Sequence, residues 1–124
     1  MKKLKNEDLK ELSKEVYNIV NRTSIELGRK TDAETMVALS KIFAKDLITH
    51  RRWYNLSINQ VDTAFYLGVR EDEKGAFKGI DIPTFFRWLR THKKRINEAI
   101  SQVEYLNKDP KQVEYYPHNQ KLLK

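Results

Sequence analysis

The residues with the clearest chemical potential are cations gathered around residue 90. From residue 87 to residue 95, five of nine positions are Lys or Arg and none is acidic. Guanidinium and ammonium groups are what phosphate oxygens attract, and guanidinium can also form paired hydrogen bonds with guanine. At 100° per residue on a helix, one polar face opposite the apolar stripe would hold most of them. That face consists of Arg87, Arg90, Thr91 and Lys94, with Arg95 beside it, and Lys93 is the fifth cation of this stretch.

The uneven distribution of charge along the chain favours a binding function for this face. The chain of 124 residues has a net charge of +7, and residues 80–101 hold five cations against two acids. A face that is only solvated usually mixes Glu with Lys, so the sign bias favours contact with a polyanion. The alternative is that these cations only form the solvent-exposed face that any helix packed on a small core must have. The pair Arg51 and Arg52 could add phosphate contacts, although cations also suit a helix C-terminus for reasons of dipole alone.

Catalytic groups are scarce in the sequence. The absence of cysteine excludes disulfides, thiolate metal sites and cysteine nucleophiles. His50, His92 and His118 lie far apart without ligand spacing, and the acidic run at 71–73 lacks the spaced pattern of a calcium loop. No Gly-rich phosphate loop, serine elbow or pair of catalytic carboxylates is present. We therefore expect a binding protein and not an enzyme, with no catalytic residue, cofactor or metal.

Apolar residues that recur every three or four positions predict the helices that must position the cations. The predicted helices cover residues 6–27, 31–54, 57–68 and 81–107. Their start signals are Asn6, capping boxes at 31–34 and 57–60, and Asp81 with Pro83, while Gly28 and Gly68 are stop signals. We expect an all-α fold, a compact bundle of about four helices in one domain at 1–107, with a polar tail at 108–124.

The apolar stripes predict which residues form the core. On the fourth helix the expected inward positions are Phe85, Leu89, His92, Ile96, Ile100 and Val103, and on the first two they include Leu9 and Ile42. Aromatic residues near the cations could instead form a stacking platform for single strands. In a domain this small, core packing is the stronger expectation, with Phe86 the exception because it lies off the main stripe.

The third and fourth predicted helices, SINQVDTAFYLGV and IDIPTFFRWLRTHKKR, resemble a helix-turn-helix unit. The resemblance rests on Ala64, on a turn at Gly68-Val69 and on a helix start with a Trp88-Leu89 pair. It implies a recognition helix whose groove-facing residues are Thr84, Arg87, Arg90, Thr91 and Lys94. The connection of residues 69–81 departs from the three or four residues of that family, which could splay the helices or cover the contact face.

Residues 57–95 also resemble small uncharacterised proteins of Bacteroidetes phages and mobile elements. The shared features are an alanine-phenylalanine helix, a Gly-rich loop and a Thr-Phe-x-x-Trp-Leu helix start, which is Thr84 to Leu89 in this chain. This resemblance implies a role in phage DNA metabolism or regulation.

These observations predict a small basic protein that binds nucleic acid, duplex DNA in preference to RNA, through its fourth helix. The alternative is an adaptor or inhibitor that binds an acidic protein surface, such as a replisome or host factor, through the same face or the tail. A homodimer stays open. The apolar runs are too short for a membrane span and no signal peptide follows the basic start, so we expect no membrane partner and a cytoplasmic location.

Overall fold

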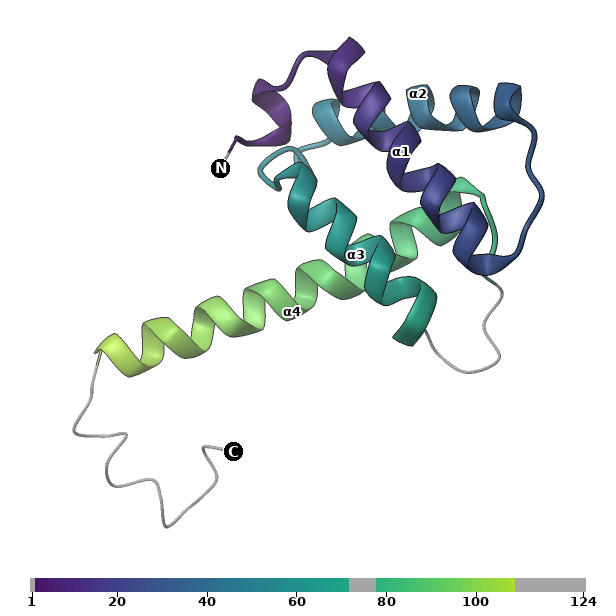
Figure 1. Ribbon diagram of the computed structural model, residues 1–124. Helices are drawn as coiled ribbons and strands as arrows, with labels where there is room; N and C mark the ends of the chain where they lie inside the picture. The colour runs from purple at the N-terminus through teal and green to yellow at the C-terminus, as the bar shows by residue number, and fades with distance from the viewer. Residues whose placement is uncertain (1, 72–77, 109–124) are drawn as a thin grey trace. The chain divides into compact units, whose positions relative to one another are not determined.

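The computed structural model describes residues 2–71 and 78–108, and within these ranges the protein is all-α (Figure 1). The helices are α1 (Leu9–Leu27), α2 (Ala33–Thr49), α3 (Ile58–Glu71) and α4 (Ile82–Lys108), preceded by the short 3-10 helix η1 (Leu4–Asn6). The described ranges contain no strand, so the predicted fold class is confirmed. None of the helices in these ranges is both long and apolar enough to cross a membrane.

The chain divides into two compact units, residues 1–92 and residues 93–124. The division falls inside α4, earlier than the boundary at 107 that the sequence favours. Only residues 93–108 of the second unit are described. The predicted tail beyond Lys108 lies outside the described residues, and so does His118.

The first two helices begin later than predicted. Asp8, not Asn6, is the N-cap of α1, and its carboxylate accepts the Glu11 N–H at 3.1 Å. Asp32 caps α2 by accepting the Thr35 N–H at 3.1 Å and the Thr35 hydroxyl at 2.7 Å. Aspartate is as good an N-cap as the predicted Asn6 and a better one than the predicted Thr31. Its negative charge also interacts favourably with the helix N-terminus.

Other end signals are confirmed. Gly28 ends α1 in the left-handed region at φ 70°, where glycine has no Cβ penalty. Ser57 and Gln60 form a reciprocal capping box, with the Ser57 N–H donating to the Gln60 side chain at 2.9 Å and the Gln60 N–H donating to the Ser57 hydroxyl at 3.3 Å. The Asp81 carboxylate accepts the Thr84 N–H at 2.9 Å and so starts α4.

The prediction that Gly68 ends the third helix is wrong. The α3 helix continues to Glu71, and Gly68 is a buried residue inside it. A Cβ at this position would overlap the indole carbons of Trp88. Gly68 therefore permits close packing of α3 on α4, and Gly68-Val69 is not the turn of a helix-turn-helix unit.

A layer of aromatic side chains fills the core of the first unit. Phe85 of α4 lies with its ring centroid 5.3 Å from Phe43 of α2 and 4.9 Å from Phe65 of α3. Trp88 adds an edge contact at 5.4 Å to Phe65. Such pairs contribute about 0.5–1.5 kcal/mol each beyond their buried area. The prediction that Phe85 and Trp88 pack in the core is therefore confirmed.

Some predicted core positions are on the surface instead. Leu9 and Ile42 are 44% and 51% exposed, and Ile100 and Val103 on the last part of α4 are 50% and 56% exposed. Burial requires a facing element as well as an apolar stripe. Leu4, to which the sequence assigns no helix, is fully buried. Its N–H donates to the Leu56 carbonyl at 2.7 Å, and this bond anchors η1 against the turn after α2.

Candidate nucleic-acid interface

Thr84 does not belong to any contact surface. Its side chain is only 2% exposed, so the prediction that it faces a DNA groove is wrong. The reason is the N-cap geometry of α4: Thr84 donates its N–H to Asp81 and sits in the first helical turn beside the buried Phe85. The start of α4, which a recognition helix would present to base edges, is used here to close the core.

Arg51 and Arg52 lie in a turn that follows α2, not on the helix as predicted. The helix ends at Thr49, and the Trp53 and Tyr54 N–H groups both donate to the His50 carbonyl, at 2.9 and 3.0 Å. The buried Trp53 side chain fixes this turn, while Arg51 and Arg52 remain exposed. The Arg52 guanidinium carbon lies 5.1 Å from the Trp53 ring centroid, in the range of a cation–π contact.

The same tryptophan joins this turn to α4. Trp53 stacks on Phe86 with the ring centroids 5.7 Å apart and the planes 24° apart. Phe86 is therefore half-buried, and its other neighbour is Phe43 at 5.1 Å. Arg90 is four residues after Phe86, so it lies one turn further along the same side of α4 and is exposed. The fold thus brings two separate basic segments of the sequence to one region.

Lys5 is a further cation that sequence reasoning missed. The Lys5 N–H donates to the Tyr54 carbonyl at 3.0 Å, and its ammonium nitrogen lies 5.4 Å from the Tyr54 ring centroid. The only available signal was the basic start of the chain, which carries no information about where it packs. We call the exposed cations Lys5, Arg51, Arg52 and Arg90 the basic corner.

The remaining predicted contact residues differ in their placement. Arg87 is half-buried, and its carbonyl accepts the Thr91 hydroxyl at 3.1 Å, although Thr91 itself is exposed. Lys93, Lys94 and Arg95 belong to the second unit, where Lys94 and Arg95 are exposed and Lys93 is half-buried. The Trp53–Phe86 stack therefore links the Arg51-Arg52 turn to the part of α4 that holds Arg90, whereas the later cations belong to the other unit.

The basic corner differs electrostatically from the arginines that hold helices together. Within residues 2–71 and 78–108, neither Arg51 nor Arg90 forms an ion pair. By contrast, Arg70 binds Glu26 with both terminal nitrogens, at 3.2 and 2.9 Å, and Arg22 pairs with Asp62. The hydrogen bonds from Arg70 hold the pKa of Glu26 below its usual value. Arg51 and Arg90 are thus available to an external anion.

Other candidate sites gain no support. His50 lies 4.0 Å from the Asp46 carboxylate, at the limit of an ion pair. The acidic run is described only at Glu71, the last residue of α3, and Asp72 and Glu73 lie outside the described residues. Within the part of the chain that the structure describes, no group of three acidic or His side chains could hold a metal ion.

Comparison with known proteins adds no assignment. No protein-family model, curated protein or solved structure matches the chain.

Proposed function

We propose that this protein binds duplex nucleic acid, DNA in preference to RNA, by placing the basic corner against the phosphate backbone. The observation that carries the proposal is the stack of Trp53 on Phe86, which joins the Arg51-Arg52 turn to the side of α4 that holds Arg90. Exposed cations are the groups that release counterions from DNA when they bind its phosphates. The resemblance to phage and mobile-element proteins gives the proposal its biological setting.

The proposed contact is with backbone and not with base edges. Phosphate contacts position a protein on DNA, whereas specificity requires side chains that reach into a groove. Because Thr84 is buried and Phe86 packs against Trp53, the first turn of α4 has little left to read bases with. Binding should therefore depend weakly on sequence.

Salt dependence tests this proposal directly. Four cations on phosphates give a slope of log K against log salt of about −3.6, so affinity should fall by roughly a hundredfold between 50 and 200 mM salt. Fluorescence anisotropy with a labelled random duplex, at these two concentrations, measures the slope. Matched single-stranded DNA and duplex RNA probes should bind more weakly. Absence of duplex binding at the lower salt concentration would end the proposal.

Charge reversal identifies the surface. Arg52→Glu with Arg90→Glu should weaken duplex binding for every sequence tested and reduce the salt slope by about two. The matched control is Lys30→Glu, an exposed cation in the connection between α1 and α2. If Lys30→Glu weakens binding as much as Arg90→Glu does, only the overall charge of the protein matters and the basic corner is not a site.

A further inference from the structure

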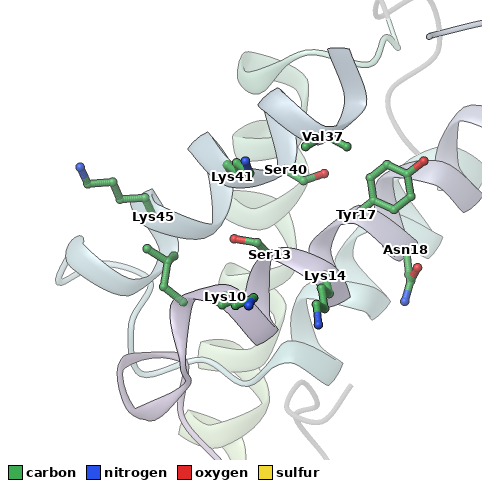
Figure 2. Close-up of a pocket in the computed structure, with 10 residues that line it drawn as sticks. Lys10, Ser13, Lys14, Tyr17, Asn18, Val37, Ser40, Lys41 and Lys45 are labelled. Atoms are coloured by element: carbon green, nitrogen blue, oxygen red, sulfur yellow. The ribbon is translucent and has the colours of Figure 1, made fainter. Parts of the chain in front are cut away.

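A groove lies between α1 and α2 (Figure 2). It has a volume of about 970 Å³, and its lining comes from residues 9–18 and 37–45. Ser13 of α1 and Ser40 of α2 both line it (Figure 2). Because both side chains are small, they leave space between larger neighbours on either side.

The floor of this groove is apolar and reachable from solvent. Leu9 and Val37 line it and are 44% and 40% exposed, while Tyr17 is half-buried. Ser40 is buried, and its hydroxyl donates to the Met36 carbonyl at 2.7 Å, so it presents no unsatisfied polar group to the groove. Exposed apolar side chains gathered in one concave place are typical of binding surfaces.

The charged residues that line the groove are all lysines. Lys10 and Lys14 come from α1, Lys41 and Lys45 come from α2, and all four are exposed (Figure 2). No acidic residue is among those that line the groove. Lys14 lies 3.6 Å from Glu11, but both side chains are 64% exposed, and such a pair is worth little in water. Two lysines four residues apart on a helix are about 6 Å apart along its axis.

We propose that this groove binds an amphipathic helix of a partner protein, with an apolar stripe on the floor and acidic residues on both flanks. The two Lys pairs, one on each helix, match acidic residues spaced four apart on either side of an apolar stripe. Binding of a helix in a groove uses anchors at i, i+4 and i+7, which span about 10 Å and fit the length from Leu9 to Tyr17.

An apolar floor distinguishes this partner from the polyanion proposed for the basic corner. A phosphate backbone has no apolar stripe to cover Leu9 and Val37, whereas an acidic amphipathic helix covers the floor and pairs with the rim. The stems of the lysines extend the apolar surface while their charged ends stay in water. The proposal does not depend on the proposed DNA binding, because the two surfaces share no residue.

A synthetic helical peptide tests the proposal. The probe is a labelled peptide of about 18 residues, with Leu at i, i+4, i+7 and i+11 and Glu on both flanks of this stripe. The control peptide has the same composition in an order that destroys the stripe. In fluorescence anisotropy with the full chain, the amphipathic peptide should bind at least about tenfold more tightly than the control. Equal affinity for the two peptides would overturn the proposal.

Variants of the protein locate the binding. Lys10→Glu with Lys41→Glu should weaken peptide binding about tenfold or more, and Ser13→Phe should abolish it by filling the groove. Lys30→Glu makes the same type of charge change outside the groove and should leave peptide binding within about twofold, since its charge is screened by salt. Helical circular dichroism checks the fold of Ser13→Phe, while the Lys variants alter only exposed side chains.

Competition distinguishes the other occupants. Duplex DNA, oleate and anionic phosphatidylserine vesicles are each added to the protein–peptide complex. None should displace the peptide at concentrations comparable with its own affinity. If oleate or vesicles displace the peptide from the wild type, and Ser13→Phe loses direct binding of that lipid, the groove binds an anionic lipid. If DNA displaces the peptide from the wild type, and Lys10→Glu with Lys41→Glu weakens direct DNA binding, the groove binds nucleic acid. Either result overturns the proposal. Failure of the peptide-binding proposal would leave the DNA-binding proposal intact, because DNA binding is tested at Arg52 and Arg90.

Discussion

The two parts of α4 have similar apolar spacing and different surroundings. In the first unit Phe85, Trp88 and Leu89 are at most 2% exposed. In the second unit Ile100 and Val103 are 50% and 56% exposed. The first part meets rings from two other helices, since Phe43 and Phe65 both contact Phe85.

This difference shows what an apolar stripe can and cannot predict. The stripe fixes which side of a helix is apolar, and it predicted α4 correctly over most of its length. Whether that side is buried depends on residues that are distant in the sequence. An isolated helix as short as residues 93–108 is only marginally stable in water. The amides of these residues should therefore be less protected from hydrogen exchange than those of the first unit.

The largest expected effect compares a core phenylalanine with a valine of the second unit. Phe43→Ala removes a ring that contacts Phe65, Phe85 and Phe86, and should lower the free energy of unfolding by about 3–5 kcal/mol. Val103→Ala should change it by less than about 0.5 kcal/mol, because this side chain is exposed. Urea unfolding followed by circular dichroism measures both. A large loss for Val103→Ala would show that the second part of α4 is covered in solution.

The next effect concerns the close approach of α3 and α4. Gly68→Ala should destabilise the protein by about 1–3 kcal/mol even though alanine favours helices, because its Cβ overlaps the Trp88 indole. Thermal unfolding measures the loss. Gly68→Ala combined with Trp88→Leu should cost less than the sum of the single changes, since the double variant relieves the overlap. Additive losses would mean that this contact does not determine the packing.

A smaller effect compares the N-cap of α4 with an exposed position in the second part of the helix. Asp81→Ala removes the N-cap that accepts the Thr84 N–H and should cost about 1 kcal/mol. Glu98→Ala, an exposed acid in the second unit, should be neutral within about 0.5 kcal/mol. Amide hydrogen exchange adds a local measurement: the Thr84 amide should lose protection in Asp81→Ala, and amides after residue 93 should exchange fast in both proteins. Slow exchange after residue 93 would contradict the comparison.

The smallest effect is on the pH dependence of the first unit. Hydrogen bonds from Arg70 lower the pKa of Glu26 in the folded protein below the usual 4.5. A lowered folded pKa stabilises the protein above the ordinary pKa of the group, and this stability is lost as the pH falls through the folded pKa. The melting temperature of the wild type should therefore fall more steeply below pH 4.5 than that of Arg70→Ala. Parallel curves would show that the pair contributes nothing.

The candidate contact residues illustrate how far the sequence could lead. Charge counting found Arg51, Arg52, Arg87 and Arg90, because the type and sign of a residue are visible in the sequence. It could not place Arg51 and Arg52 beside α4, since the Trp53–Phe86 stack that does so joins residues 33 positions apart. It also placed Thr84 on the surface, because helical periodicity does not show when a residue of the first turn packs inward.

The sequence by itself determined that the described chain is all-α, where most helices lie, and that its cations outnumber its acids. These properties depend on local signals: apolar periodicity, capping side chains and composition. Only the tertiary structure decided that Gly68 lies inside a helix, that Thr84 is buried, and that small residues at positions 13 and 40 leave a groove rimmed by lysines. Each of these depends on which side chain of another helix occupies the neighbouring space, and no local pattern encodes that.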